Sequence, residues 1–115
     1  MGDRRVTNPS RHAVLAERAR VADTFTARAV GLLGQKNAGG GLILEPCSSI
    51  HTWFMGFAID VCFLDAENVV LAVYARLRPW RMTRIVRGAR RVLELDAGGM
   101  GDTAVGDRLE VVPCG

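Results

Sequence analysis

Two cysteines, a histidine and an aspartate fall within one apolar stretch, CSSIHTWFMGFAIDVCFLD, which spans residues 47–65. Cys47 or Cys62 could act as a nucleophile if His51 accepted the thiol proton. Asp60 could then orient the imidazole, which completes the roles that a cysteine hydrolase needs. No glycine turn that could form an oxyanion hole adjoins either cysteine. The pattern is therefore incomplete, and we predict no catalytic residue from it.

The same side chains include soft and borderline ligands that zinc or iron accepts. Cys47 and His51 are separated by three residues, and they make one loose pair of possible ligands. A structural zinc site usually shows two paired elements, such as two C-x-x-C motifs. Free cysteines are among the residues most often buried in protein cores. We therefore predict simple buried thiols, with no metal site and no other cofactor.

Asp60 interrupts the apolar run FAI-VCF and so needs an explanation of its own. An ionised carboxylate there would lose its hydration unless hydrogen bonds or a cation replaced it. Its partner could be His51, the hydroxyl of Thr52, the amides of a turn, or an arginine. Asp60 then either organises the sheet or faces a polar pocket, and both interpretations remain open. The predicted binding or organising residues are His51, Thr52, Trp53, Met55 and Asp60.

The charge of the chain is modest, but its arginines are unevenly placed. Seven arginines and no acidic residue lie between Ala75 and Arg91. Five of them recur at every third position, a spacing that aligns side chains along a polyproline-like segment. Such a stripe could bind phosphates, or it could be a solvated loop. The candidate anion-binding residues are Arg78, Arg81, Arg84, Arg87 and Arg90.

The chain length of 115 residues suits one domain. Residues 1–11 show no periodicity and are expected to be a flexible N-terminal extension, followed by a single β-rich domain over residues 12–115. A first strand is predicted from His12 to Val21, and a helix of about ten residues follows it, capped by Asp23 or Thr24 and ended by Gly34.

Short strands are predicted over most of the remaining chain. They are expected at LILEP, at residues 50–54, at residues 59–64, at VVLAVYARL, at RVLELD and at GDRLEVV. The turn DAEN, residues 65–68, should join two of them into a β-hairpin. Six or so short strands with one helix predict a mainly β sandwich or barrel.

Three cysteines are an odd number, so at least one thiol stays free unless it pairs with another chain. The first twenty residues are polar and basic, unlike a signal peptide. No later stretch reaches the length of a membrane span. These features predict a cytoplasmic protein without a transmembrane segment.

Several short motifs resemble, in order and spacing, the family known as domain of unknown function 192. They are GLLGQ, PCSSIHTWFMGFAIDVCFLD, RPWR, VLELDAGG and GDRLEVV, and they cover the chain from about Thr24 to Val112. The resemblance implies a jelly-roll-like sandwich with one short helix after the first strand, and it implies no reaction. Many members of that family are exported. The family's characteristic positions correspond to His51, Thr52, Phe54, Met55, Ile59, Asp60, Phe63, Asp65, Pro79, Leu93, Glu94, Gly98, Gly106 and Asp107.

Three functions are compatible with these features. The one we favour is a non-enzymatic binding or accessory module, with a polar cleft around His51 and Asp60 that takes a small-molecule or protein ligand. The second is a thiol- or metal-assisted hydrolase that uses Cys47, His51, Asp60 and Cys62. The third is binding of nucleic acid or acidic lipid through the segment from Arg76 to Arg91. We rank the first highest because the sequence lacks a complete catalytic set.

Overall fold

The computed structural model describes residues 2–114, except for the side chains of Phe25 and Thr26. Its elements in chain order are β1 (Arg4–Asn8), η1 (Pro9–Arg11), β2 (Ala13–Ala22), α1 (Phe25–Val30), β3 (Leu42–Leu44), β4 (Ile59–Leu64), β5 (Val70–Leu77), β6 (Arg91–Asp96) and β7 (Glu110–Pro113). The strands form one sheet in the order β5-β4-β6-β3-β2-β1-β7. The predicted mainly β class with one short α-helix is confirmed. The sheet does not close into a barrel, because β5 and β7 remain as its edges.

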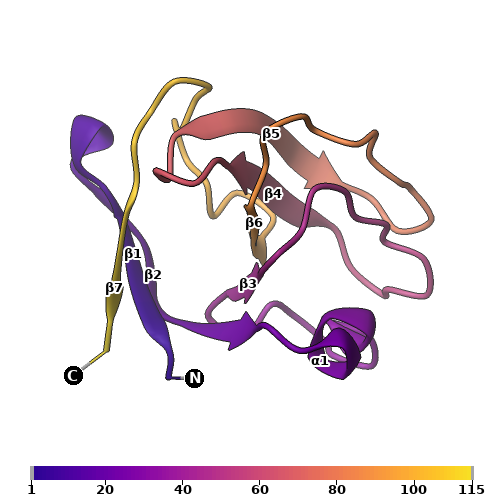
Figure 1. Cartoon of the computed structure of the whole chain (residues 1–115). Coiled ribbons are helices and arrows are strands. Elements are labelled where there is room, and N and C mark those ends of the chain that lie inside the picture. Colours follow the sequence, from indigo (N-terminus) through magenta and orange to yellow (C-terminus); the bar gives the residue numbers. More distant parts are fainter. Residues whose placement is uncertain (1, 115) are drawn as a thin grey trace.

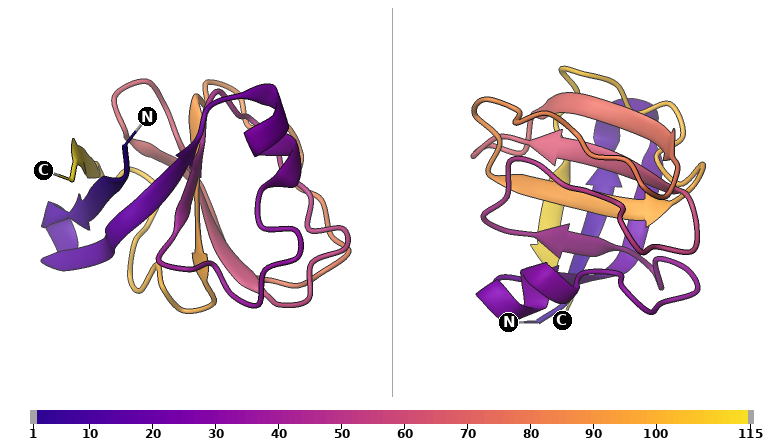
Figure 2. Two further views of the ribbon diagram at one scale, coloured as in Figure 1. Left: turned by 90° about the horizontal axis from the view of Figure 1, so that it is seen from below. Right: turned by 90° about the vertical axis from the view of Figure 1, so that its right-hand side faces the viewer.

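The sheet is divided into two groups of strands that face each other across the first core. Strands β1, β2 and β7 form one group, and β3, β6, β4 and β5 form the other (Figure 1). The right-hand view of Figure 2 shows that the strands of the two groups cross. Strand β2 belongs to both groups, since its last three residues pair in parallel with β3. The core between the groups contains Val6, Ala16, Ala19, Ile43, Cys62, Leu64, Val70, Leu93, Leu95, Met100 and Leu109.

A second core lies on the other face of β3, β6, β4 and β5. Helix α1 and two long loops cover this face (Figure 2). We call residues 45–58 the site loop and residues 78–90 the arginine loop. All six residues of β4 are buried, because its two faces contact different cores. The strand predicted at residues 59–64 is confirmed, and its side chains alternate, with Ile59, Val61 and Phe63 in the second core and Cys62 and Leu64 in the first.

The hairpin predicted around residues 65–68 is also confirmed. Strands β4 and β5 are antiparallel. The Asp65 carboxylate closes the turn, since one of its oxygens accepts the amides of Glu67 at 2.8 Å and Val69 at 2.9 Å. This is the side-chain-to-backbone bonding that favours aspartate in turns.

The expectation of a flexible terminus is wrong for residues 4–11. Strand β1 pairs with β2 on one side and with β7 on the other. Val6 is fully buried in the first core, and the side chains of Asn8 and Arg11 both donate to Asp107, each at 3.0 Å to Oδ2. Strand β7 and Asp107 lie about a hundred positions away in sequence, so the local pattern of residues 4–11 does not reveal these contacts.

The predicted helix is shorter than expected, and one predicted strand is absent. Helix α1 begins at the predicted cap, where the hydroxyl oxygen of Thr24 accepts the amide of Ala27 at 3.1 Å. It ends at Val30 rather than at Gly34, because Gly31 has a φ of 50° and turns the chain. The strand predicted at residues 50–54 is instead part of the site loop, which forms only an isolated bridge between His51 and Met82. No helix within residues 2–114 is long and apolar enough to cross a membrane.

Candidate functional site

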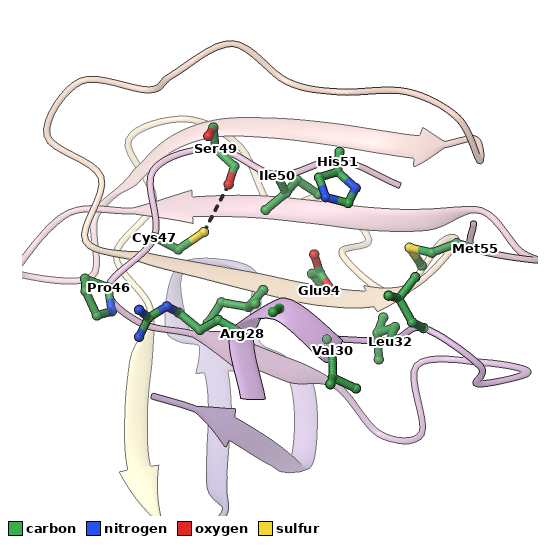
Figure 3. Close-up of a pocket in the computed structure, with 14 residues that line it drawn as sticks. Arg28, Val30, Leu32, Pro46, Cys47, Ser49, Ile50, His51, Met55 and Glu94 are labelled. Carbon is green, nitrogen blue, oxygen red and sulfur yellow. Dashed lines mark hydrogen bonds between the residues drawn. The ribbon is translucent and has the colours of Figure 1, made fainter. Parts of the chain in front are cut away.

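A cavity of about 290 Å³ lies between α1, the turn that follows it, and the site loop (Figure 3). Most of its wall is apolar, and a few polar side chains converge on it. The lining residues are Arg28, Ala29, Val30, Gly31, Leu32, Leu33, Leu44, Pro46, Cys47, Ser49, Ile50, His51, Met55 and Glu94. This combination of apolar wall and few polar groups is typical of small-molecule sites.

Glu94 of β6 is the buried acidic group of this cavity. Its cross-strand neighbours are Leu42 and Val61, so the carboxyl lies among apolar side chains of the second core. Glu94 is 5% exposed, and its carboxyl group faces the cavity (Figure 3). None of the hydrogen bonds among the described groups of residues 2–114 involves this carboxyl, and the fully enclosed side-chain atom without a partner among those groups is Asn8 Oδ1, not an oxygen of Glu94. Burial raises the pKa of Glu94 from its ordinary value to about 7.

Cys47 lies at the edge of the cavity, in the half-buried part of the site loop. Its thiol donates a hydrogen bond to the carbonyl oxygen of Ser49 at 3.1 Å (Figure 3). Burial raises the pKa of this thiol, so the reactive thiolate is disfavoured. Cys47 is therefore a hydrogen-bonded thiol and not an activated nucleophile.

His51 and Met55 of the site loop also reach the cavity. Met55 is buried and contributes to the second core. His51 is exposed, and its ring stacks on Trp53 with centroids 4.7 Å apart. The same histidine accepts the amide of Trp53 on Nδ1 at 3.3 Å. Both residues line the cavity, and their role in binding stays a prediction.

Asp60 is not part of that cavity. Its side chain is 2% exposed and turns toward the first core, on the opposite face of the sheet from Glu94. One oxygen accepts the amide of Arg76 at 2.9 Å, and the other accepts the amide of Met100 at 3.0 Å. The structure thus gives Asp60 two backbone amides, one from the end of β5 and one from the turn after β6; turn amides were one of its predicted alternatives. It does not bring Asp60 and His51 together.

The second cysteine of the predicted set is also remote. Cys62 is fully buried in the first core, and burial raises its pKa to about 12. Cys47 and Cys62 therefore lie on opposite faces of β4 and its neighbours. Within residues 2–114, no group of three or more histidine, cysteine, aspartate or glutamate side chains could hold a metal ion. The four residues of the hydrolase hypothesis do not form one site.

Thr52 is fully buried between the site loop and the arginine loop. Its hydroxyl donates to the carbonyl oxygen of Arg78 at 2.6 Å and accepts the amide of Arg81 at 3.0 Å. The backbones of the loops are joined as well, by the amide of Thr83 to the carbonyl of Ile50 at 2.9 Å. Thr52 is therefore one side-chain link between these loops, and Thr83 is another, since its hydroxyl accepts the amide of Ile50 at 3.1 Å.

The five arginines at every third position are all exposed, on a loop without regular secondary structure. They do not line the cavity. Arg91, at the end of the same segment, differs from them because it forms an ion pair with Glu45 at 2.6 Å. The anion-binding hypothesis therefore concerns a separate surface.

The sequence analysis did not place Glu94 or Arg28 in the candidate site, although Glu94 is one of the characteristic positions of the family that the chain resembles. The alternation in VLELD places Leu93 and Leu95 on one face and Glu94 on the other, which is typical of a strand with one face in water. Helix α1 and the loops cover that second face, and nothing in the local pattern reveals them. The available signals were a carboxylate at the centre of a strand and its place among the family's characteristic positions.

A protein-family model, DUF192, described as "Uncharacterized ACR, COG1430", matches residues 6–111. The UPF0127 protein of Pyrococcus abyssi is 34% identical over 113 residues, which cover 91% of this chain and 95% of that protein. The UPF0127 protein of Thermococcus sibiricus is 32% identical over 111 residues, which cover 90% of this chain and 71% of that protein.

Two solved structures are similar in fold. A protein of unknown function from Novosphingobium aromaticivorans has a TM-score of 0.74 and 20% identity, with 94% of this chain and 83% of that chain covered. A Sinorhizobium meliloti protein described as a "putative transcription regulator" has a TM-score of 0.77 and 19% identity, with 95% of this chain and 92% of that chain covered. At this identity the likeness shows the fold alone.

Proposed function

From the premise that the chain belongs to the DUF192 family, whose description names no reaction, we propose that it is a small-molecule-binding module. The proposed ligand site is the cavity between α1 and the site loop. This retains the non-enzymatic binding function favoured by the sequence and replaces Asp60 by Glu94 as the acidic group of the cleft.

The observation that carries the proposal is the Glu94 carboxyl, which is buried, faces the cavity and lacks a hydrogen-bond donor among the described groups. The carboxyl is open to the cavity, and a ligand that donates a hydrogen bond to it would pair it inside an apolar wall, where charge-assisted hydrogen bonds are strong. The apolar wall, which includes Leu32, Leu44 and Ile50, would contact the rest of the ligand.

The chemistry of the cavity favours an apolar amine. An ammonium group supplies both donors and the opposite charge, which together make the strongest hydrogen bonds to a carboxylate. The guanidinium of Arg28 does not compete for Glu94, because it donates to the carbonyl oxygens of Asp23 at 3.2 Å and Glu45 at 3.3 Å. It points away from Glu94 toward Pro46 (Figure 3).

Thermal unfolding with a matched series of probes tests this proposal. Benzylamine, benzyl alcohol and benzoate have one shape and three different head groups, and hexylamine, hexanol and hexanoate repeat the comparison with a linear body. We expect the amines to raise the melting temperature in a concentration-dependent way, since a ligand that binds only the folded state stabilises it. The effect should be larger at pH 8 than at pH 5.5, because Glu94, with its pKa of about 7, is ionised only at the higher pH.

The variant Glu94→Gln separates the specific site from general binding. It keeps the size of the side chain and removes the charge, so stabilisation by the amines should disappear while the variant still unfolds cooperatively. The matched control is Glu67→Gln, at an exposed position in the β4–β5 turn. Stabilisation by the acids instead of the amines, no stabilisation by either amine, or an unchanged response of Glu94→Gln would each refute the proposal.

We also propose that the protein works in the cytoplasm. The support is that Cys47, Cys62 and Cys114 are all free in this fold, as expected in a reducing compartment. Fractionation of cells that express the full-length protein tests this assignment. Recovery in the periplasmic or extracellular fraction would contradict it.

A further inference from the structure

The two loops that cover the second core expose an unusual number of large apolar side chains. Both tryptophans of the chain are among them. The exposed fractions are 41% for Trp53, 71% for Phe54, 58% for Trp80, 66% for Met82 and 70% for Ile85. We call these five residues the apolar patch. Soluble proteins rarely leave such a concentration of apolar side chains in water without a partner for it.

Contacts between the two loops bring members of the patch together. The rings of Phe54 and Trp80 meet edge to face, with centroids 4.7 Å apart. Met82 forms an isolated antiparallel bridge with His51, and the His51 ring stacks on Trp53. The patch is therefore built by both loops together.

Two members of the patch occupy backbone positions that suit other residues better. Phe54 has a φ of 66° and Trp80 has a φ of 64°. Glycine and asparagine adopt this left-handed conformation readily, whereas it is rare for bulky residues. The fold alone therefore does not favour an aromatic side chain at either position. What these side chains add is apolar surface.

The two loops that carry the apolar patch have basic side chains and no acidic ones over residues 46–58 and 78–90. The exposed side chains of Arg78, Arg81, Arg84, Arg87 and Arg90 lie on the same loop as Trp80, Met82 and Ile85. Neither residues 46–58 nor residues 78–90 contain an aspartate or a glutamate. A surface that combines exposed apolar groups with unopposed arginines is complementary to a partner that is apolar inside and anionic outside.

We propose that the apolar patch and the arginine loop dock the protein on an anionic lipid bilayer. Tryptophan and phenylalanine partition into the interfacial region of a bilayer, and arginine side chains bind the phosphates of anionic lipids. Met82 and Ile85 favour lipid over nucleic acid, because aliphatic side chains offer no stacking surface to bases. This inference is independent of the amine site, since none of the five patch residues lines that cavity.

The two tryptophans make a direct test possible, because Trp53 and Trp80 are both in the patch. The purified full chain is mixed with vesicles of phosphatidylcholine alone, or of phosphatidylcholine and phosphatidylglycerol in equal amounts. We expect tryptophan emission to shift to shorter wavelength and the protein to sediment with the anionic vesicles only. Lipids brominated along the acyl chain should quench the emission, and added salt should weaken binding.

Substitutions separate the charged and apolar contributions. Arg84→Gln and Arg87→Gln should each weaken binding roughly five-fold, the equivalent of about 1 kcal/mol per basic residue near an anionic surface. Arg20→Gln, at an exposed position of β2, is the matched control and should change little. Phe54→Asn and Trp80→Asn suit the left-handed backbone, so they should abolish insertion without loss of thermal stability. Val105→Asn, at an equally exposed position outside the patch, is their control.

Three outcomes would overturn the proposal. The first is the absence of both sedimentation and an emission shift with anionic vesicles. The second is equal loss of binding in the Arg20→Gln or Val105→Asn controls, which would show that this surface is not the docking site. The third is tighter binding to single-stranded RNA homopolymers than to the vesicles, which would assign the surface to nucleic acid.

Discussion

The amide of Met100 donates to Oδ2 of Asp60 at 3.0 Å, across forty positions of the sequence. The other carboxylate oxygen accepts the amide of Arg76 at 2.9 Å, where Arg76 has a φ of 53° beside a register shift between β4 and β5. Asp60 thus joins the irregular end of β5 to the loop after β6. Hydrogen bonds from two amides offset the loss of hydration that a buried carboxylate suffers.

Replacing Asp60 should therefore destabilise the fold. In Asp60→Asn, the amide nitrogen of the new side chain would face one of the two backbone donors, which loses one hydrogen bond and places two donors together. We expect a loss of about 2–4 kcal/mol in the free energy of unfolding, measured with urea. Asp102→Asn, at an exposed position in the neighbouring loop, should change it by less than about 0.5 kcal/mol. Equal stability of the two variants would show that Asp60 does not organise the sheet.

The raised pKa of Glu94 makes a second prediction, about the dependence of stability on pH. The folded state has a pKa of about 7 at this group, against an ordinary value of 4.5. Between these values the folded state binds more protons than the unfolded state, so the free energy of unfolding should fall as pH rises from 4.5 to 7. The expected decrease is roughly 3 kcal/mol.

The variant Glu94→Gln should remove this decrease, because no proton is taken up on folding at that position. Urea unfolding at half-unit intervals from pH 4.5 to pH 8 measures both profiles. Glu67→Gln, at an exposed site, should retain the profile of the unsubstituted protein. Superimposable profiles for Glu94→Gln and the unsubstituted protein would contradict the assignment.

Much of the sheet could be predicted because local periodicity reflects it. The apolar run at residues 59–64 predicted the strand β4, and the turn at Asp65 predicted the hairpin. What could not be predicted depends on segments that are distant in sequence. Strand β1 is held by β7 and by Asp107, at the other end of the chain.

For the cavity too, local sequence predicted some residues, whereas others depend on distant segments. The sequence could place His51 and Met55 near each other because the site loop carries them close together, and both line the cavity. Glu94 was missed because the strand pattern of β6 does not reveal that α1 and the site loop bury its second face. Asp60 was recognised as a buried carboxylate, but the sequence left open whether amides or a pocket surround it. The surroundings of a carboxylate on a strand depend on which face of the sheet a distant loop or helix covers. The sequence of the strand itself does not encode that choice.

A third prediction concerns the reactivity of the cysteines. Cys62 is fully buried with a pKa of about 12, and Cys47 is half-buried with a raised pKa. At pH 8 we expect an aromatic disulfide reagent to leave Cys62 unmodified in the folded protein and to modify Cys47 slowly. Peptide mapping by mass spectrometry identifies the modified residue. Rapid modification of Cys47 would indicate an activated thiolate and would contradict the raised pKa of this thiol.

The link that Thr52 makes between the two loops leads to the last prediction. Thr52→Val keeps the shape of the side chain but removes the hydroxyl that bonds to Arg78 and Arg81. The two backbone groups would lose a partner, and we expect a loss of about 1–3 kcal/mol in stability. The arginine loop should also open more often, so trypsin should cleave after Arg81 and Arg84 faster than in Ser49→Ala, a change at an exposed position of the same site loop. Cleavage at the same rate in both variants would mean that the other bonds between the loops, those from the Thr83 amide and hydroxyl to Ile50, hold them together without Thr52.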